Sequence, residues 1–273
     1  MDIRTLASAD ELRQVYELEL EIWGRESAED RVSVLMLLVS TRIGGLVAGA
    51  FDGGRLAGFV YGLPGIRDGR PYLWSHMMGV RPEYRNSGLG HRLKVEQRRL
   101  AMAAGLDLIA WTYDPLQAMN AHLNFVKLGV VAREYHPDAY PGSASPLHAG
   151  TATDRLVVDW RLSSDRVTDR LARVERHEPP RRDAAAAVPI NRVRAAGEWI
   201  APAGLDLSID APRLALTIPM GFTEMQQRDL PLAREWRSVT REAFTTSLAR
   251  GYEVTDFVLH REQCRGDYVL ARA

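Results

Sequence analysis

The chain has 273 residues, of which 46% are hydrophobic and 26% charged, so it is long enough for one large globular domain or two modest ones. Its 35 basic and 35 acidic residues cancel, which argues against a nucleic-acid surface or a polybasic membrane anchor as the main partner. The single cysteine, Cys264, excludes an intrachain disulfide, and the lack of a signal peptide and of a membrane-length apolar run predicts a cytoplasmic protein.

The first predicted element is a helix. Residues 8–11, Ser-Ala-Asp-Glu, form a capping-box pattern, and apolar residues recur behind it at helical spacing up to Trp23. Glu19 falls on the same face as these apolar residues. We expect its carboxylate to reach water at the edge of that face, with a role as a base or as a ligand for the acceptor as the alternative.

A second short helix is expected over residues 33–42, and strands are expected over 46–51 and 55–63. Asp52-Gly53 between the two strands is typical of a hairpin turn. The order of these elements indicates an α/β or α+β sheet with helices on both faces.

The central strand is predicted over residues 72–80. Strict alternation sends successive side chains of a strand to opposite faces, which places on one face Trp74, His76, Met78 and Val80. His76 is therefore an imidazole in the middle of an apolar strand and needs a partner. Two roles remain open for it, a general base and a hydrogen-bonded core histidine.

A glycine-rich turn follows this strand and leads into a helix predicted over residues 91–104. The pattern is Arg85-x-x-Gly88-x-Gly90, and Val-x-Pro precedes it. Glycine lets the backbone bend and lets a ligand approach, and the first turn of a helix presents N–H groups that favour an anion. Arg85 adds a cation whose geometry suits phosphate. Gly-x-Gly-x-x-Gly and Gly-x-x-x-x-Gly-Lys-Ser/Thr are both absent, so neither a Rossmann site nor a P-loop is supported.

A second motif follows a strand predicted over residues 106–113. It reads Asn-Ala-His-Leu-Asn-Phe-Val-Lys-Leu-Gly over residues 120–129. The first motif resembles the pyrophosphate loop of the GNAT superfamily, the acyl-CoA-dependent N-acyltransferases, and the second resembles the late helix of the same superfamily. The order of elements fits this superfamily over residues 1–162.

This resemblance implies an α/β (α+β) fold with a GNAT-like mixed central sheet flanked by helices. It also implies acetyl-CoA or succinyl-CoA as co-substrate without a metal, and the histidines show no metal-binding spacing. The residues that the resemblance assigns to the co-substrate are Met78, Gly79, Val80, Arg85, Asn86, Ser87, Gly88, Leu89, Gly90, Asn120 and Asn124.

Within this set, N–H groups near Met78 to Val80 would polarise the thioester carbonyl. Asn120 and Asn124 would bond the pantetheine amides, and helix capping or a surface position is the alternative for either asparagine.

One position departs from the superfamily pattern. Members often carry Tyr two residues before the Lys of the late helix, where it protonates the leaving thiolate, and this chain has Phe125. A thiol with a pKa of ~8.5 leaves tolerably without that proton, and general-acid help is typically worth ~10²–10⁴-fold, so its loss slows the reaction without forbidding it. Candidate substitutes are Tyr113, Tyr135 and Tyr140.

The implied reaction is attack of an amine on the thioester carbonyl of acyl-CoA. An alkylammonium with a pKa near ~10 must first lose a proton, which calls for a base. His76 is the best candidate, because relatives often project the base from this same strand. His122 on the late helix is expected at the surface, and His91 near the phosphate.

The rest of the chain changes in character after residues 1–162. Residues 163–189 read as a crossover or linker that begins with a charged helix and continues into Pro179-Pro180. Residues 190–273 are expected to form a smaller C-terminal α/β domain without its own CoA motif.

In that last segment, a strand ending at Pro219 precedes a long helix that opens at Asp229. Trp236 and Phe244 on this helix are expected in the core rather than in a cofactor site. Two final strands are predicted over 252–260 and 268–271, with Gly266-Asp267 in the turn between them.

We therefore expect an N-acyltransferase that moves an acetyl or other short acyl group to an amine of a small molecule in a ternary complex. One alternative is an N-succinyltransferase acting on amino acids, in which Arg67, Arg70 or Arg133 would bind the succinyl carboxylate. The other is a catalytically weak acyl-CoA-binding sensor or scaffold, which Phe125 favours. Neither nucleic acid nor a membrane is expected as a partner. Residues 190–273 are expected either to close the acceptor side of the first domain or to build a homodimer.

Overall fold

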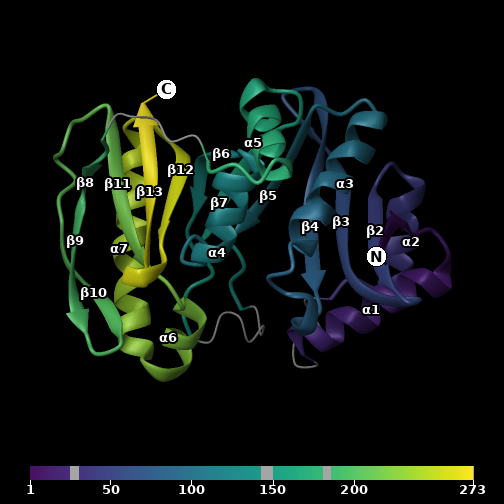
Figure 1. The fold of residues 1–273 in the computed structure, drawn as a ribbon, viewed down its shortest axis with the longest axis horizontal. Helices are drawn as coiled ribbons and strands as arrows, with labels where there is room; N and C mark the ends of the chain where they lie inside the picture. Colours follow the sequence, from purple (N-terminus) through teal and green to yellow (C-terminus); the bar gives the residue numbers. More distant parts are fainter. Residues whose placement is uncertain (25–30, 143–149, 181–185, 273) are drawn as a thin grey trace. The chain divides into compact units, whose positions relative to one another are not determined.

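A computed structural model describes residues 1–24, 31–142, 150–180 and 186–272 (Figure 1). These residues form two compact units. The first unit comprises residues 1–24, 31–111 and 161–163, and the second comprises residues 112–142, 150–160, 164–180 and 186–272. Both contain helices and strands, which confirms the predicted mixed α/β class. Residues 181–185 of the predicted linker lie outside the described residues.

The sheet of the first unit has the strand order β1-β2-β3-β4-β5, antiparallel except for the parallel pair β4 and β5. Its strands are β1 (Asp2–Thr5), β2 (Leu46–Asp52), β3 (Arg55–Arg67), β4 (Arg70–Val80) and β5 (Leu108–Tyr113), the last of which runs on into the second unit. Its helices are α1 (Ala9–Trp23), α2 (Val34–Arg42) and α3 (Leu89–Ala103), and a short 3₁₀ turn, η2 (Pro82–Tyr84), precedes α3.

Helices flank the sheet of the first unit (Figure 1), and two apolar clusters pack between the helices and the strands. Under α1 and α2, Leu12, Leu18 and Leu37 pack with Phe59 and Tyr61 of β3. Under α3, a second cluster contains the small and branched residues of the opposite face, namely Ala48, Ala50, Ala57, Val60, Leu89 and Leu93. Successive β3 residues therefore serve opposite cores, as strand alternation requires.

Local signals set the ends of these elements. The capping box at Ser8 is present, with Glu11 N–H donating to Ser8 Oγ at 3.3 Å and Ser8 N–H donating to the Glu11 carboxylate at 3.2 Å. The predicted hairpin is also present, and its turn is formed by Gly53 and Gly54, whose φ values of 54° and 87° suit the tight primed turn.

The second unit has the strand order β7-β6-β12-β13-β11-β8 and a separate pair β10-β9. Its strands are β6 (Val131–His136), β7 (Arg155–Arg161), β8 (Val188–Pro189), β9 (Asn191–Ala196), β10 (Trp199–Leu205), β11 (Arg213–Pro219), β12 (Tyr252–His260) and β13 (Arg265–Arg272). Its helices are α4 (Ala118–Ala121), the π-helix η3 (His122–Leu128), α5 (Asp165–Glu175), α6 (Phe222–Arg228), α7 (Leu230–Ala249) and the 3₁₀ turn η4 (Arg261–Gln263).

The long helix α7 forms as predicted. Asp229 caps it by accepting the Leu232 N–H at 3.1 Å, and Pro231 stands in its first turn. Trp236 and Phe244 are fully buried, which confirms their place in the core.

The predicted turn at Gly266-Asp267 is wrong. Both residues lie inside β13, and the chain turns earlier, through η4 and Cys264 with its φ of 47°. Glycine is required at position 266 for another reason, because a Cβ there would clash with the Phe257 ring on the neighbouring strand β12. The glycine makes room for an aromatic ring.

The compact units divide the chain differently from the predicted domains 1–162 and 190–273. Val254 of β12 pairs with Ala132 of β6, so the C-terminal strands share a sheet with residues that precede 162. The domain assignment itself stays a prediction.

Candidate active site

The turn between β4 and α3 contains the glycine-rich motif. Gly88 stands at the N-cap of α3 with a φ of 85°, a left-handed conformation that favours glycine. It has no side chain with which to cap the helix, so the first N–H groups of α3 stay available to a ligand. Asn86 also has a positive φ, of 61°.

The surface of this turn is open. Arg85, Asn86, Ser87 and Gly88 are exposed, and a Cβ at Gly88 would meet no atom within 4 Å. Behind them Leu89 is buried and anchors the helix. An exposed helix N-terminus with an adjacent guanidinium is a combination that fits the pyrophosphate of a CoA thioester.

Two hydrogen bonds brace the turn. Arg85 donates from Nε to the Val80 carbonyl at 3.4 Å, and Ser87 Oγ donates to the Tyr84 carbonyl at 2.7 Å. A Cβ at Gly90 would lie 3.5 Å from Cε of Met78, which is ordinary contact, so Gly90 faces the end of β4 rather than open space.

One edge of β4 is left open. Its pairing with β5 is limited to Leu73 with Ile109 and Trp74 with Ala110. On the other side β4 stays paired with β3, and the Arg81 N–H donates to the Ala57 carbonyl at 2.9 Å. Because N–H directions alternate along a strand, those of Met78 and Val80 point towards the open edge. The two predicted donors for the thioester carbonyl thus share that edge.

β4 carries a bulge at His76. Tyr61 of β3 pairs with Met77 and Gly62 pairs with Ser75, so no residue lies opposite His76. The extra residue breaks the alternation of the strand. Met77 packs with the core under α1 and α2, whereas Met78 and Val80 pack with the core under α3. The prediction that His76 shares a face with those two residues is therefore wrong.

The His76 ring lies beside Tyr61, at 5.8 Å between ring centroids and 83° between planes. Its side chain is accessible to solvent, yet enough protein surrounds the ring to disfavour the imidazolium, which lowers the pKa of His76. Among the described residues the His76 side chain makes no hydrogen bond, whereas the alternative role, a structural histidine in the core, requires one. A neutral, accessible imidazole is suited to accept a proton.

Glu19 is buried rather than at the edge of its helix face. It is 1% exposed, so the expectation that its carboxylate reaches water is wrong. The segment before α2 covers it, and the Val32 N–H donates to Oε2 at 3.4 Å. Its Oε1 has no partner among the described residues. Burial raises the pKa of Glu19 to about 7.

Glu19, Tyr61 and Ser40 lie on the same face of the first unit. Tyr61 Oη bonds Ser40 Oγ at 2.6 Å, and Ser40 Oγ in turn donates to the Met36 carbonyl at 2.7 Å. Burial, and less strongly the charge of Glu19, raise the pKa of Tyr61. A carboxyl group that is half ionised near neutral pH is therefore close to the aromatic neighbour of His76.

Lys94 is a feature that sequence reasoning did not find. It lies on α3 with 3% exposure, and its Nζ bonds Ser75 Oγ at 2.8 Å and Gln97 Oε1 at 3.2 Å. The ammonium also lies 3.6 Å from the ring centroid of Trp111. Burial without a carboxylate partner lowers the pKa of Lys94 well below its usual value. Its place on a basic helix gave no sign of this burial.

The late helix belongs to the second unit and is a short α-helical turn followed by a π-helix. Asn120 is exposed, whereas Asn124 is 3% exposed. The backbone carbonyl of Asn124 accepts the Val130 N–H at 3.2 Å. π-Helical turns concentrate at functional sites, because they re-aim side chains by one residue. The pantetheine role of both asparagines stays a prediction.

Phe125 is fully buried between two tyrosines of the second unit. Its ring centroid lies 6.5 Å from that of Tyr113 and 5.9 Å from that of Tyr268. The two tyrosine hydroxyls bond each other at 2.8 Å, and Tyr268 donates to the Pro115 carbonyl at 2.6 Å. Burial raises the pKa of both tyrosines. Tyr113 is therefore a poor substitute acid.

The other two candidate acids differ from each other. Tyr135 donates to Asp154 at 2.6 Å, and burial together with that carboxylate raises its pKa. Tyr140 is 42% exposed, and its hydroxyl lies 3.1 Å from Thr112 Oγ1. Of the two, only Tyr140 presents an accessible hydroxyl.

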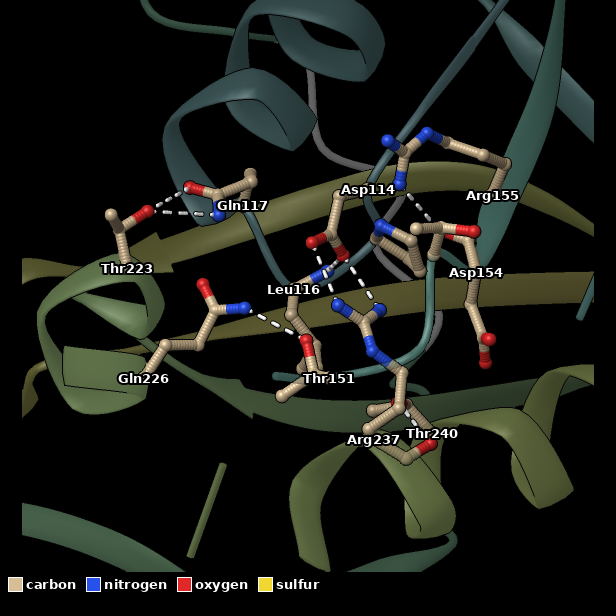
Figure 2. A network of polar contacts seen from close by, with 12 residues as sticks. Asp114, Leu116, Gln117, Thr151, Asp154, Arg155, Thr223, Gln226, Arg237 and Thr240 are labelled. Atoms are coloured by element: carbon tan, nitrogen blue, oxygen red, sulfur yellow. Dashed lines mark hydrogen bonds and ion pairs between the residues drawn. The ribbon is translucent and has the colours of Figure 1, made fainter. Parts of the chain in front are cut away.

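A buried polar network, which the sequence did not indicate, joins α7 to other parts of the second unit (Figure 2). Arg237 meets Asp114 with both terminal nitrogens, at 2.8 and 2.7 Å, and both side chains are at most 10% exposed. One turn further along α7, Arg241 meets Asp154 at 2.9 and 2.6 Å. Figure 2 also shows Gln117 with Thr223 and Gln226 with Thr151. These bonds join α7, α6 and the loops that follow β5 and precede β7, whereas the buried Nε of Arg237 has no partner among the described residues.

The arginines considered for a succinyl carboxylate are placed unequally. Arg133 is engaged by Glu253 at 2.5 and 2.8 Å. Arg67 lies over the Tyr72 ring at 5.0 Å, and Arg70 is exposed at the start of β4. Only the latter two belong to the unit that holds His76.

Within the described ranges, no group of three or more His, Cys, Asp or Glu side chains is arranged to hold a metal ion. None of the helices in this part of the chain is both long and apolar enough to cross a membrane.

The strand, open edge, glycine turn and helix define an α/β protein with a turn suited to bind an anion. Residues 10–128 match the model of the acetyltransferase (GNAT) family. This match supports acyl transfer as the general reaction and an acyl-CoA as co-substrate. Comparison with curated protein sequences gives no significant match.

Several solved structures are similar to part of the chain. The ribosomal-protein-S18-alanine N-acetyltransferase from Escherichia coli is 16% identical, with a TM-score of 0.48 over 60% of this chain and 94% of its own. Aminoglycoside 6'-acetyltransferase type Ii is 19% identical, with a TM-score of 0.47 over 60% of this chain and 99% of its own. The PaiA N-acetyltransferase from Thermoplasma acidophilum, in complex with coenzyme A, is 18% identical, with a TM-score of 0.40 over 59% of this chain and 99% of its own.

Proposed function

We propose that this protein is an N-acyltransferase that moves an acetyl or other short acyl group from acyl-CoA to an amine of a small molecule. The observation that carries the proposal is the exposed turn at Arg85 to Gly88, which leads from the open edge of β4 into the uncapped N-terminus of α3. Donors for a pyrophosphate and for a thioester carbonyl then belong to one continuous segment of chain.

In this mechanism the residues of the turn bind the pyrophosphate, and the N–H groups of Met78 and Val80 polarise the thioester carbonyl. His76 takes a proton from the attacking amine. The amine nitrogen forms the new amide bond while the bond from carbonyl carbon to sulfur breaks, and the thiolate leaves. No covalent acyl-enzyme is needed, because donor and acceptor react in a ternary complex.

Phe125 determines how the thiolate leaves. The nearest tyrosine hydroxyls, those of Tyr113 and Tyr268, bond each other inside the core and so do not serve as acids. The thiolate departs unprotonated or takes a proton from water, and Tyr140 stays a prediction as the substitute acid. We expect slower turnover than a general acid would give, by a factor within the ~10²–10⁴ typical of such help.

Binding of acetyl-CoA and succinyl-CoA, measured by calorimetry, tests the site. Gly88→Glu should abolish binding, because it places a carboxylate on the anion site and a Cβ in a left-handed conformation. Gly105→Glu is the matched control: this glycine follows the other end of α3, has a φ of 78°, and a Cβ there would likewise meet no atom within 4 Å. Equal affinity in both variants would contradict the assignment.

The same calorimetric titrations show which acyl group the protein prefers. Preference for succinyl-CoA that Arg67→Gln or Arg70→Gln removes would support the N-succinyltransferase. Arg133→Gln is expected to have no effect, since Glu253 already holds that side chain.

A free-thiol assay against amino acids, polyamines and aminoglycosides separates the enzyme from the sensor or scaffold that Phe125 favours. Release of CoA above the hydrolysis rate supports the transferase, and its absence across the panel supports the sensor. A cytoplasmic location, a homodimer and a role of residues 190–273 in closing the acceptor side stay predictions.

A further inference from the structure

An open pocket lies at the end of β12 in the second unit. It has a volume of about 370 Å³ and is lined by His122 of η3 and by the consecutive residues Leu259 to Gln263 of β12 and η4. The volume falls in the range of ~300–1,000 Å³ that is typical of small-molecule sites. None of the residues proposed above to bind acyl-CoA lines it.

The pocket carries unneutralised positive charge. The side chain of Arg261 is exposed and makes no hydrogen bond or ion pair within the described ranges of the chain. Lys127 lies on the same π-helix as His122. Burial first, and then the charges of Lys127 and Arg261, lower the pKa of His122 to about 4. The cations are therefore close enough to disfavour a third positive charge.

Of the three nearby carboxylates, two are engaged by other side chains. Asp256 of β12, which alone opposes the shift at His122, is held by Arg170 of α5 at 2.7 Å. Asp267 bonds His260 Nε2 at 2.9 Å. Glu262 is the one carboxylate among the lining residues.

His122 also has an unmet hydrogen-bonding atom. Its Nδ1 is buried and has no partner among the residues that the structure describes. The expectation of a plain surface role for His122 is therefore wrong. Buried polar nitrogens are rarely left without a partner, so this atom points to a ligand that completes the site.

We propose that this pocket binds a phosphate group, held by the guanidinium of Arg261 and by the ring of His122. A guanidinium fork matches two phosphate oxygens, and a neutral imidazole donates one N–H. A cationic ligand is disfavoured by Arg261 and Lys127. Because the bound anion favours the imidazolium, it raises the pKa of His122, so phosphate binding and protonation of His122 strengthen each other.

Sodium phosphate, titrated at constant ionic strength, is the probe. The imidazole ¹⁵N signals are recorded by NMR, and His122→Asn assigns the His122 resonance. We expect a saturable shift of that resonance and a rise in its titration midpoint. Arg261→Gln should weaken phosphate about tenfold, the effect of losing a charge-assisted hydrogen bond.

Arg194→Gln is the control, since Arg194 is an exposed arginine of β9 outside the pocket. It should leave the titration unchanged, and Gly88→Glu should too. CoA and 3′-dephospho-CoA identify the source: a shift with CoA alone assigns the CoA 3′-phosphate, and a shift with phosphate alone assigns a free phosphate or another phosphorylated molecule. No saturable shift with any of the three probes, or equal weakening in both arginine variants, overturns the proposal.

Discussion

Buried charged groups in the two units have different partners. In the second unit, Asp114 and Asp154 each meet an arginine fork from α7. In the first unit, Glu19 and Lys94 make no ion pair among the described residues, although the charge of Arg31 acts on Glu19, and burial moves the pKa of each towards the neutral form. The paired charges are fixed and structural, whereas the unpaired groups can exchange protons near the candidate active site.

The largest effect should come from breaking a pair in the second unit. Asp114→Ala leaves Arg237 buried and unpaired, which should lower the free energy of unfolding by about 3–5 kcal/mol. Urea denaturation followed by circular dichroism measures it. Glu224→Ala, which removes an exposed partner of Arg228, is the control and should cost at most about 1 kcal/mol. Equal losses in both variants would mean that burial of the pair is unimportant.

For His76 in the first unit, we expect a substitution to lower turnover rather than stability. His76→Ala should lower turnover by about 10²-fold or more at neutral pH and leave acyl-CoA affinity nearly intact. The loss should shrink at high pH, where the free amine is abundant. His136→Ala, at an exposed histidine of β6, is the control. A His76 variant that fails to fold would support the structural reading instead.

The buried carboxyl group of Glu19 should make the stability of the protein depend on pH. A carboxyl group whose folded-state pKa is raised from 4.5 to about 7 binds its proton more tightly when folded, so the protein loses stability as the pH rises between these values. The loss should be complete above pH ~7 and amount to about 3 kcal/mol.

Glu19→Gln should therefore unfold at the same denaturant concentration as the parent at pH ~4 and at a higher one at pH ~8. Denaturation curves across this range measure it. If the difference between the two proteins does not grow with pH, Glu19 has a partner that neutralises its charge.

The smallest effect should come from Tyr61. Tyr61→Phe removes the hydrogen bond to Ser40, whose hydroxyl keeps its bond to the Met36 carbonyl. The expected loss is about 1 kcal/mol of stability. Ser40→Ala should cost more in the same denaturation assay, because it removes both bonds and leaves the buried Tyr61 hydroxyl without this partner. An equal loss in the two variants would contradict this account of the pair.

Local patterns predicted much of this molecule. The capping box at Ser8, the hairpin near Gly53 and the turn at Gly88 depend on a few adjacent residues, and their signals were readable in the sequence. The burial of Glu19 was not, because a segment more than ten residues away covers it. The pair of Asp114 and Arg237 joins residues 123 positions apart, and no local pattern announces it.

Two errors had a shared cause. The face of His76 was predicted by assuming a period of two along β4, and the bulge breaks that period. Gly266 was assigned to a turn because glycine is common there, whereas the ring of Phe257 requires it inside a strand. In both places a neighbouring strand, rather than the segment itself, decides the geometry.

The bulge has a consequence for the length of the chain. β4 contains one residue more than its ladder with β3 requires. Ser75 and Met77 already lie opposite Gly62 and Tyr61, so deletion of position 76 alone would make the register regular. Such a chain keeps both hydrophobic clusters and has no imidazole beside Tyr61. In a gene, one codon then separates this protein from a copy of the same fold that lacks the proposed proton acceptor.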